Sequence, residues 1–315
     1  MFDYYYNDVG LILEPRIRPS KILIKEPRPI FHEEMKFYHL DDIFDFEESD
    51  APYFWADGTS WIYRGRKIGK LKIKDYFPEQ AYFEVSPDFS ERKLIACNLE
   101  ELNRLNKNAI EELRAETVAR IRKSYDPETF YYVSFSGGKD SVALLEIVDE
   151  AIHGKYVVVW GNTQMEFPDT YEFVDEVEKL CASRNIKFYR AQSRLEVFES
   201  WRLFAPPSKR QRWCCSVHKS TPVRILSREL AKGYKHSCSF IGVRRCESFL
   251  RRDRPIEVDE KDSKVVGEKN FNAIADWTSA EVWLYLFSKH ALINKAYRKG
   301  FKRVGCLVCP MTGER

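Results

Sequence analysis

The sequence has no long hydrophobic run and no large excess of charge of either sign. No apolar stretch reaches the roughly 18 residues that a membrane helix needs, and the opening MFDYYYNDVG lacks the basic and apolar regions of a secretory signal. The 51 Lys and Arg residues nearly balance the 48 Asp and Glu residues, so the net charge of +3 does not by itself indicate a nucleic-acid partner. We therefore expect a soluble, cytoplasmic protein without membrane association.

Charge is nevertheless unevenly distributed along the chain. Residues 202–254 are rich in Lys and Arg and contain few acids. Such a block is typical of proteins that bind a polyanion, such as a nucleotide or a nucleic-acid backbone. A solvated basic face is an equally good interpretation of this pattern.

Hydrophobic periodicity divides the chain into three parts. Residues 1–95 contain short apolar stretches separated by turn signals, which predicts a separate, mostly β module. Residues 96–126 have apolar side chains at helical spacing and predict a linker helix. From residue 127 to residue 315 strand and helix patterns alternate, which predicts an α/β domain with a parallel sheet and helices on both of its faces.

A glycine loop between a predicted strand and a predicted helix is the sharpest local motif. Backbone amides at the start of a helix favour an anion, and two glycines allow phosphate to approach closely. We expect Lys139 and Asp140 to be catalytic, with Asp140 holding Mg²⁺; the alternative is an ordinary glycine turn. The loop does not match the Walker A pattern. The residues expected to bind nucleotide here are Ser136, Gly137, Gly138, Lys139, Asp140 and Ser141.

Eight cysteines in 315 residues do not suit a small disulfide scaffold. Four of them form two close pairs, the adjacent Cys214 and Cys215 and the C-x-x-C of Cys306 and Cys309. Clustered cysteines in a cytosolic chain more often indicate metal binding or catalysis. The other four are expected to be small buried hydrophobic residues. These are Cys97, Cys181, Cys238 and Cys246.

The loop SGGKDS resembles the PP-loop signature of the phosphoadenosine phosphosulfate (PAPS) reductase family and the adenine nucleotide alpha-hydrolase superfamily. The resemblance extends over about residues 127–315 and includes GVRRCES from Gly242 and the WT…VW pattern from Trp277. It implies that Asn162 and Thr163 also contact the nucleotide, although the family usually has Asp-Thr-Gly there. It further implies a bidentate contact of Arg244 with phosphate or sulfate; a structural salt bridge of an Arg with Glu247 is the alternative.

The same resemblance implies a [4Fe-4S] cluster held by all four paired cysteines, as in adenylyl-sulfate reductases and related DNA-thiolating enzymes. Four thiolates are what such a cluster requires. Adjacent cysteines fit a compact zinc site poorly, because paired zinc ligands are normally two to four residues apart. Zinc and unligated cysteines remain the alternatives. The expected ligands are Cys214, Cys215, Cys306 and Cys309.

The function is predicted from one difference between this sequence and the sulfonucleotide reductases. Sulfonucleotide reductases share a Glu-Cys-Gly-Leu-His segment with a nucleophilic cysteine, and this sequence does not contain it. The resemblance therefore favours an ATP pyrophosphatase that adenylates an acceptor for sulfur transfer, closest in character to the enzymes of DNA phosphorothioation. The expected partners are ATP with Mg²⁺, a DNA or tRNA acceptor and a cysteine desulfurase as sulfur donor. The alternatives are a reductase of adenylyl sulfate (APS) or PAPS, and a nucleotide-binding scaffold subunit.

Overall fold

The computed structural model describes residues 2–16, 26–73, 81–261 and 267–311. Its larger part is a six-stranded sheet in the order β10-β9-β8-β11-β13-β12. All neighbours in this sheet run parallel except β12 and β13, which pair antiparallel at one edge. The strands are β8 (Thr129–Phe135), β9 (Val157–Asn162), β10 (Phe188–Gln192), β11 (His236–Ile241), β12 (Glu257–Val258) and β13 (Lys269–Phe271).

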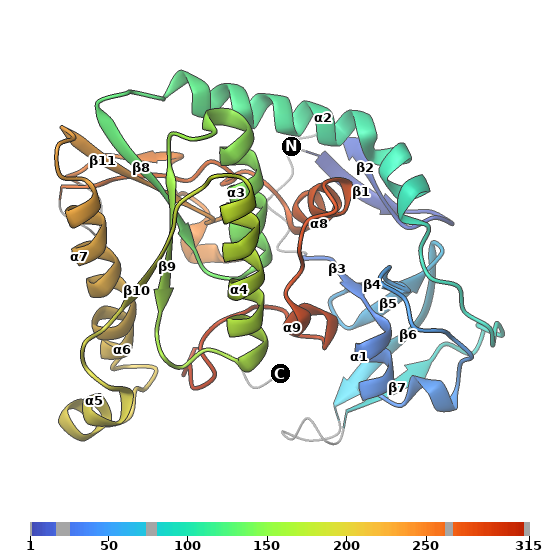
Figure 1. Ribbon diagram of the computed structural model, residues 1–315. Helices are drawn as coiled ribbons and strands as arrows, with labels where there is room; N and C mark the ends of the chain where they lie inside the picture. Colours follow the sequence, from blue (N-terminus) through green and yellow to red (C-terminus); the bar gives the residue numbers. More distant parts are fainter. Residues whose placement is uncertain (1, 17–25, 74–80, 262–266, 312–315) are drawn as a thin grey trace.

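Helices cover both faces of this sheet, as predicted (Figure 1). Strand β8 shows why, because its side chains alternate between two cores. Tyr131, Val133 and Phe135 pack into the main core with α3, α4 and α8, whereas Phe130 and Tyr132 pack on the side of α7. The helices are α2 (Leu99–Lys123), α3 (Lys139–Ile152), α4 (Pro168–Ser183), α5 (Val197–Phe204), α6 (Trp213–Cys215), α7 (Thr221–Leu230), α8 (Ser279–Ser288) and α9 (Lys295–Arg298).

A second, antiparallel sheet occupies the N-terminal part of the chain and has its own hydrophobic core. It lies beside α8 and α9, at the right of Figure 1. Helix α1 (His32–Phe37) connects two of its strands. In sheet order these strands are β3 (Arg28–Ile30), β4 (Phe54–Asp57), β5 (Ser60–Tyr63), β6 (Arg66–Ile73) and β7 (Ala81–Val85).

The first two strands, β1 (Phe2–Tyr6) and β2 (Leu11–Pro15), form a hairpin apart from that sheet. Their buried residues belong to the main core, not to the core of the five-stranded sheet. Asn106 of α2 holds the edge of β2, since its Oδ1 accepts from Leu13 N at 2.8 Å and its Nδ2 donates to Leu11 O at 3.1 Å. By packing, the hairpin is therefore part of the larger domain, while the predicted division at residues 95 and 126 stays a prediction.

Helix α8 begins with a capping box. The Thr278 side chain accepts from Glu281 N, and the Glu281 carboxylate accepts from Thr278 N. The same carboxylate accepts from Phe2 N at 2.8 Å, which ties the hairpin to this helix. No helix in the described ranges combines the length and apolar character that a bilayer crossing demands.

Candidate functional site

The phosphate loop lies where β8 passes into α3. Gly138 is the N-cap of α3, and Gly137 has a φ of +75°, which favours glycine. A Cβ at Gly137 would lie 3.1 Å from Thr170 Cγ2, and one at Gly138 would lie 3.1 Å from Tyr297 Oη. Both positions therefore need glycine for close packing as well as for the approach of a ligand.

Neighbouring side chains fix the shape of this loop. Ser141 Oγ donates to Gly138 O at 2.8 Å and lies 3.2 Å from Ser136 N, which donates to it. Tyr297 Oη accepts from Lys139 N at 3.0 Å, and Asn294 Nδ2 donates to Gly137 O at 3.2 Å. The sequence gave no sign that Asn294 and Tyr297 support the loop.

A buried group of four charges surrounds the start of α3, and we call it the four-charge cluster. Its members are Glu26, Lys139, Asp140 and Arg244. Lys139 Nζ lies 2.9 Å from both carboxylate oxygens of Asp140, and Arg244 Nε lies 2.6 Å from Asp140 Oδ1. Arg244 also makes a bidentate pair with Glu26, at 2.9 Å and 2.6 Å. Glu26 comes from the N-terminal part of the chain, 218 residues away, and the sequence analysis missed it.

The charges of this cluster tune one another. Burial alone would raise the pKa of Asp140, but Arg244 and Lys139 outweigh burial and hold it below its usual value. Burial, together with the repulsion of Arg244, lowers the pKa of Lys139 despite the nearby Asp140. Two cations and two carboxylates give a group without net charge, so an incoming phosphate or Mg²⁺ must exchange partners with it.

Arg244 has the position that the sequence predicted, but its donors are already engaged. Its side chain is 1% exposed, and its nitrogens point to Asp140, Glu26 and the carbonyl of Trp277. The pair envisaged with Glu247 is made by Arg251 instead. A direct contact of Arg244 with phosphate stays a prediction, and it requires Glu26 to release the guanidinium.

Gly242 brings the end of β11 against the phosphate loop. A Cβ there would lie 3.1 Å from Asp140 C and Asp140 O and 3.2 Å from Ser141 N. These neighbours are backbone atoms, which cannot turn aside as a flexible side chain can. Gly242 therefore sets how closely Arg244 approaches Asp140.

The second predicted nucleotide contact lies at the end of β9. Asn162 Nδ2 donates to Gln192 Oε1 at 2.8 Å, and its Oδ1 accepts from Gln164 N at 2.9 Å. Thr163 is 2% exposed, and its Oγ1 lies 3.3 Å from Cys306 Sγ. Both side chains thus organise the strand end and connect it to the second cysteine pair.

Both cysteine pairs lie at the edge toward which β8 and β9 point, at the lower side of Figure 1. Leu307 N donates to Met165 O at 2.7 Å, which anchors the Cys306–Cys309 turn beside β9. The pKa of Cys214 is raised, first by burial, then by Cys215, with a smaller contribution from Cys309 of the second pair.

The geometry of a metal site is not formed by these cysteines. Among residues 2–16, 26–73, 81–261 and 267–311, no three His, Cys, Asp or Glu side chains converge closely enough to hold a metal ion. The donor chemistry suits an iron–sulfur cluster, but the arrangement does not amount to a ligand set. The cluster, and equally zinc, stay predictions, and no chemical step is derived through either.

His218, beside the first pair, is fully buried. Its Nε2 lies 2.8 Å from Ser200 Oγ, and Nδ1 has no hydrogen-bond partner in the described part of the chain. Burial lowers its pKa, so the ring is neutral at pH 7. The unpaired Nδ1 shows that polar groups near this pair are not fully satisfied by protein atoms.

The four isolated cysteines have no sign of nucleophilic activation. Burial raises the pKa of Cys97, Cys181 and Cys238 to about 12. Cys246 is 6% exposed, and burial raises its pKa despite the neighbouring Arg244. A thiol with a raised pKa is a poor source of thiolate at neutral pH.

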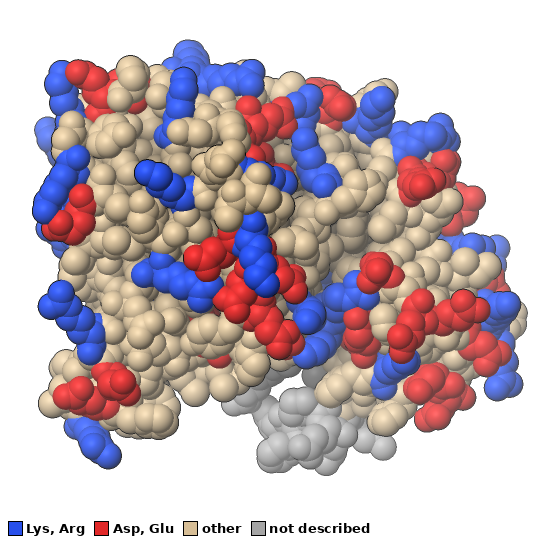
Figure 2. Space-filling model, in the orientation of Figure 1, with Lys and Arg blue, Asp and Glu red and all other residues tan. Residues whose placement is uncertain are grey.

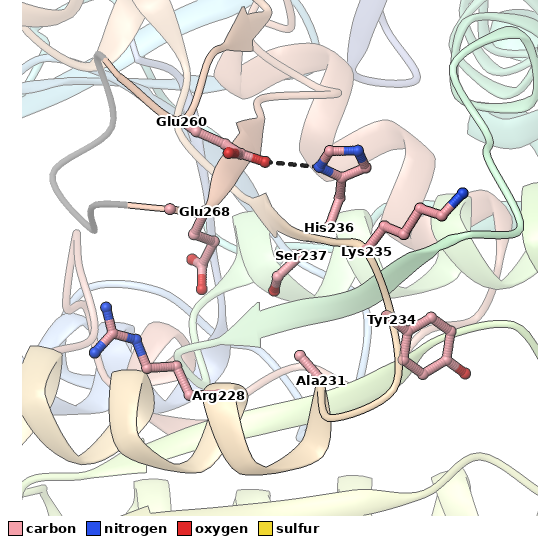
Figure 3. A pocket seen from close by; sticks show the side chains of 9 residues that line it. Arg228, Ala231, Tyr234, Lys235, His236, Ser237, Glu260 and Glu268 are labelled. Carbon is pink, nitrogen blue, oxygen red and sulfur yellow. Dashed lines mark hydrogen bonds and ion pairs between the residues drawn. The ribbon is translucent and has the colours of Figure 1, made fainter.

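A pocket of about 180 Å³ lies at the end of the sheet opposite to the phosphate loop (Figure 3). Its lining includes Arg228, His236 and Glu268, and His236 pairs with Glu260 at 3.0 Å. His236 is the first residue of β11, so the pocket lies at the amino ends of the parallel strands. Ligands of open α/β sheets bind outside the carboxyl ends, so we expect a nucleotide at the phosphate loop rather than in this pocket.

A family profile, the phosphoadenosine phosphosulfate reductase domain, matches residues 131–312. The chain belongs to this family. Its fold, a mostly parallel sheet between helices with a smaller antiparallel β module, agrees with that assignment.

Relatives of this chain include proteins without an assigned function. An uncharacterised protein of Methanocaldococcus jannaschii is 29% identical over 97% of this chain and 69% of its own length. A second from that organism is 31% identical over 68% of this chain, which spans 44% of that relative. The adenosine 5′-phosphosulfate reductase of Geobacillus kaustophilus is 27% identical over 62% of this chain and 77% of its length. A solved structure of the PAPS reductase of Candida auris aligns with a TM-score of 0.46 and 19% identity, over 68% of this chain and 97% of that one.

Proposed function

We propose that this chain is an ATP pyrophosphatase that adenylates an acceptor for sulfur transfer. We further propose that the acceptor is a nucleic acid, as in DNA phosphorothioation or tRNA thiolation. The observation that best supports this is the four-charge cluster at the strand–glycine loop–helix junction. It places Lys139 and an ionised Asp140 at the amide-rich start of α3, where phosphate binds readily.

The proposed reaction has two displacements. An acceptor oxygen attacks the α-phosphorus of ATP, the bond from that phosphorus to the bridging oxygen breaks, and pyrophosphate leaves. A sulfur nucleophile then displaces AMP from the activated acceptor. Adenylation turns a poor leaving oxygen into a good one, and fixed amide donors stabilise the charge that develops on the phosphates.

The chain's own residues supply binding and orientation. Gly137 and Gly138 admit the phosphates to the backbone amides, and Tyr297 and Asn294 keep the loop in shape. Lys139 provides a cation near the leaving pyrophosphate. Asp140 has oxygen ligands of the kind Mg²⁺ prefers, and bound Mg²⁺ would neutralise phosphate charge.

A sulfonucleotide reductase is the second candidate, because a relative bears that name. Such chemistry requires a nucleophilic cysteine outside the two pairs. The four remaining cysteines all have raised pKa values, which weighs against this candidate. A scaffold subunit would bind ATP without releasing pyrophosphate.

The test is pyrophosphate release from ATP and Mg²⁺ by anaerobically purified protein, with single-stranded DNA, tRNA or no acceptor. Parallel reactions contain APS or PAPS with a thiol reductant and are assayed for sulfite. We expect pyrophosphate only with ATP, and its loss in Asp140→Asn. Sulfite that disappears in Cys246→Ser would show a reductase, and ATP binding without either product would show a scaffold.

A further inference from the structure

The surface of residues 194–224, which we call the basic segment, differs from the rest of the protein in its charge. It carries seven Lys or Arg residues and two Glu residues, a net charge of +5. The whole chain carries +3, so everything outside this segment sums to −2. The basic segment includes α5 and α6 and lies at the lower left of Figure 1.

Cations elsewhere on the surface are commonly paired with acids. Arg104 lies 2.6 Å from Glu101, and Lys299 lies 2.8 Å from Asp169. Figure 2 shows acidic and basic side chains intermixed across the middle of one face. In contrast, none of the seven cations of the basic segment forms an ion pair with a described residue. They are Arg194, Arg202, Lys209, Arg210, Arg212, Lys219 and Arg224.

Large apolar side chains are exposed between these cations. On α5, Phe198 is 71% exposed, Leu203 63% and Phe204 47%. Phe204 packs against Trp213 with ring centroids 5.2 Å apart, so part of this aromatic surface is held in place. Exposed aromatic rings beside unpaired cations are the two elements of a surface for single-stranded nucleic acid, where bases stack and phosphates meet Lys or Arg.

The basic segment leads to the candidate active site. A Cβ at Gly161, near the end of β9, would lie 3.5 Å from Lys219 Cγ. One end of the segment therefore lies beside the strand ends where the phosphate loop opens.

We propose that the basic segment binds a single-stranded nucleic acid, with phosphates on its unpaired cations and bases on Phe198 and Phe204, and directs it toward the phosphate loop. This rests on the proposed function for its acceptor. A single strand is favoured over a duplex because bases expose their faces for stacking only when unpaired.

The experiment measures binding without ATP, so its outcome is independent of pyrophosphate release. Fluorescence anisotropy follows labelled single strands of about 15 nucleotides, as RNA and as DNA, and a matched duplex, between about 50 and 200 mM salt. The test variant is Arg202→Gln/Arg210→Gln/Arg212→Gln. The matched control is Lys36→Gln/Arg104→Gln/Lys232→Gln, which removes the same charge from exposed cations that have acidic partners.

We expect the test variant to lose at least about tenfold in affinity for a single strand at 100 mM salt. The slope of log affinity against log salt should become shallower by about 2, because each phosphate contact of a single strand contributes about 0.7. The control should change affinity less than about twofold, since its cations are engaged elsewhere. A comparison of the RNA strand with the DNA strand shows whether the surface prefers ribose or deoxyribose.

The aromatic contribution is tested separately. Phe198→Ala changes a side chain that is mostly exposed, so the variant should fold, as circular dichroism would show. It should lose about fivefold or more in affinity without a change of salt slope, because stacking does not release counterions. Equal losses in the test and control triples, tighter binding of the duplex, or binding only to phosphatidylserine vesicles would overturn the proposal.

Discussion

The four-charge cluster and the basic segment use the same residue types in opposite ways. In the cluster two buried cations form close ion pairs with two carboxylates, of which Glu26 is partly exposed. In the basic segment seven cations lie on or near the surface without an acidic partner among the described residues. Burial makes an unpaired charge costly, whereas solvent tolerates it. The first region is therefore organised by its own charges, and the second is ready for charges from outside.

The largest loss of stability is expected when the four-charge cluster loses one of its two cations. Arg244→Met removes the buried cation that Asp140 and the partly exposed Glu26 share, and losing one partner of a buried pair costs up to about 3–5 kcal/mol. Arg210→Met in the basic segment should change stability by less than about 0.5 kcal/mol. Urea unfolding of both variants at pH 7 measures the difference. Similar small losses would mean that the cluster does not stabilise the fold.

A glycine substitution beside Asp140 should lower the stability of the protein less than the loss of Arg244 does. Gly242→Ala places a methyl group 3.1 Å from the carbonyl of Asp140, and such overpacking typically costs about 1–3 kcal/mol. Gly305→Ala is the matched control, because no atom lies within 4 Å of its Cβ position. Thermal unfolding should show a lower midpoint only for Gly242→Ala. Equal midpoints would show that β11 can shift without cost.

Removing one carboxylate should give the four-charge cluster a net positive charge, as the basic segment has. Glu26→Gln leaves a net positive group at the phosphate loop, and we expect ATP to bind roughly fivefold more tightly, equivalent to about 1 kcal/mol of charge interaction. Glu48→Gln removes an exposed acid of the same part of the chain and should have no effect. Calorimetric titration with ATP provides the measurement. Weaker ATP binding by Glu26→Gln would show that Glu26 positions Arg244 instead of competing for it.

Glu268 extends the comparison to a buried acid that lines a pocket together with Arg228 (Figure 3). Burial raises its pKa, although Tyr132 Oη donates to it at 2.8 Å and the charge of Arg228 acts to lower it. An acid whose folded pKa is raised favours folding below its unfolded pKa, and that contribution is lost as the pH rises through the folded value. The stability of Glu268→Gln relative to the natural protein should therefore improve between pH 4.5 and pH 8. Urea unfolding across this range would contradict the prediction if the difference stayed constant.

Local patterns predicted much of the α/β domain. The strand before the phosphate loop is where the sequence placed it, because its signal lies within a few residues. Helix α5 was not predicted, since its apolar residues are exposed and do not follow a buried stripe.

The missing parts of the site depend on contacts between distant residues. Glu26 reaches Arg244 across 218 positions, and Tyr297 reaches Lys139 across 158. His218 is buried because Ser200 and Trp213 happen to enclose it. No short motif contains such information. The predicted loop residues lie together between β8 and α3, and their nucleotide contacts stay a prediction, while the residues that hold the loop had to come from the structure.

The bond from Phe2 N to Glu281 has a consequence for the order in which the protein is made. It joins residues 279 positions apart, and Glu281 also accepts from the cap of its own helix. At about 5–20 residues per second, a ribosome needs roughly 15–60 s to reach Glu281 after Phe2 has been synthesised. Throughout that interval the hairpin of β1 and β2 lacks its bond to α8, so only α2, which is synthesised much earlier, can hold it in place.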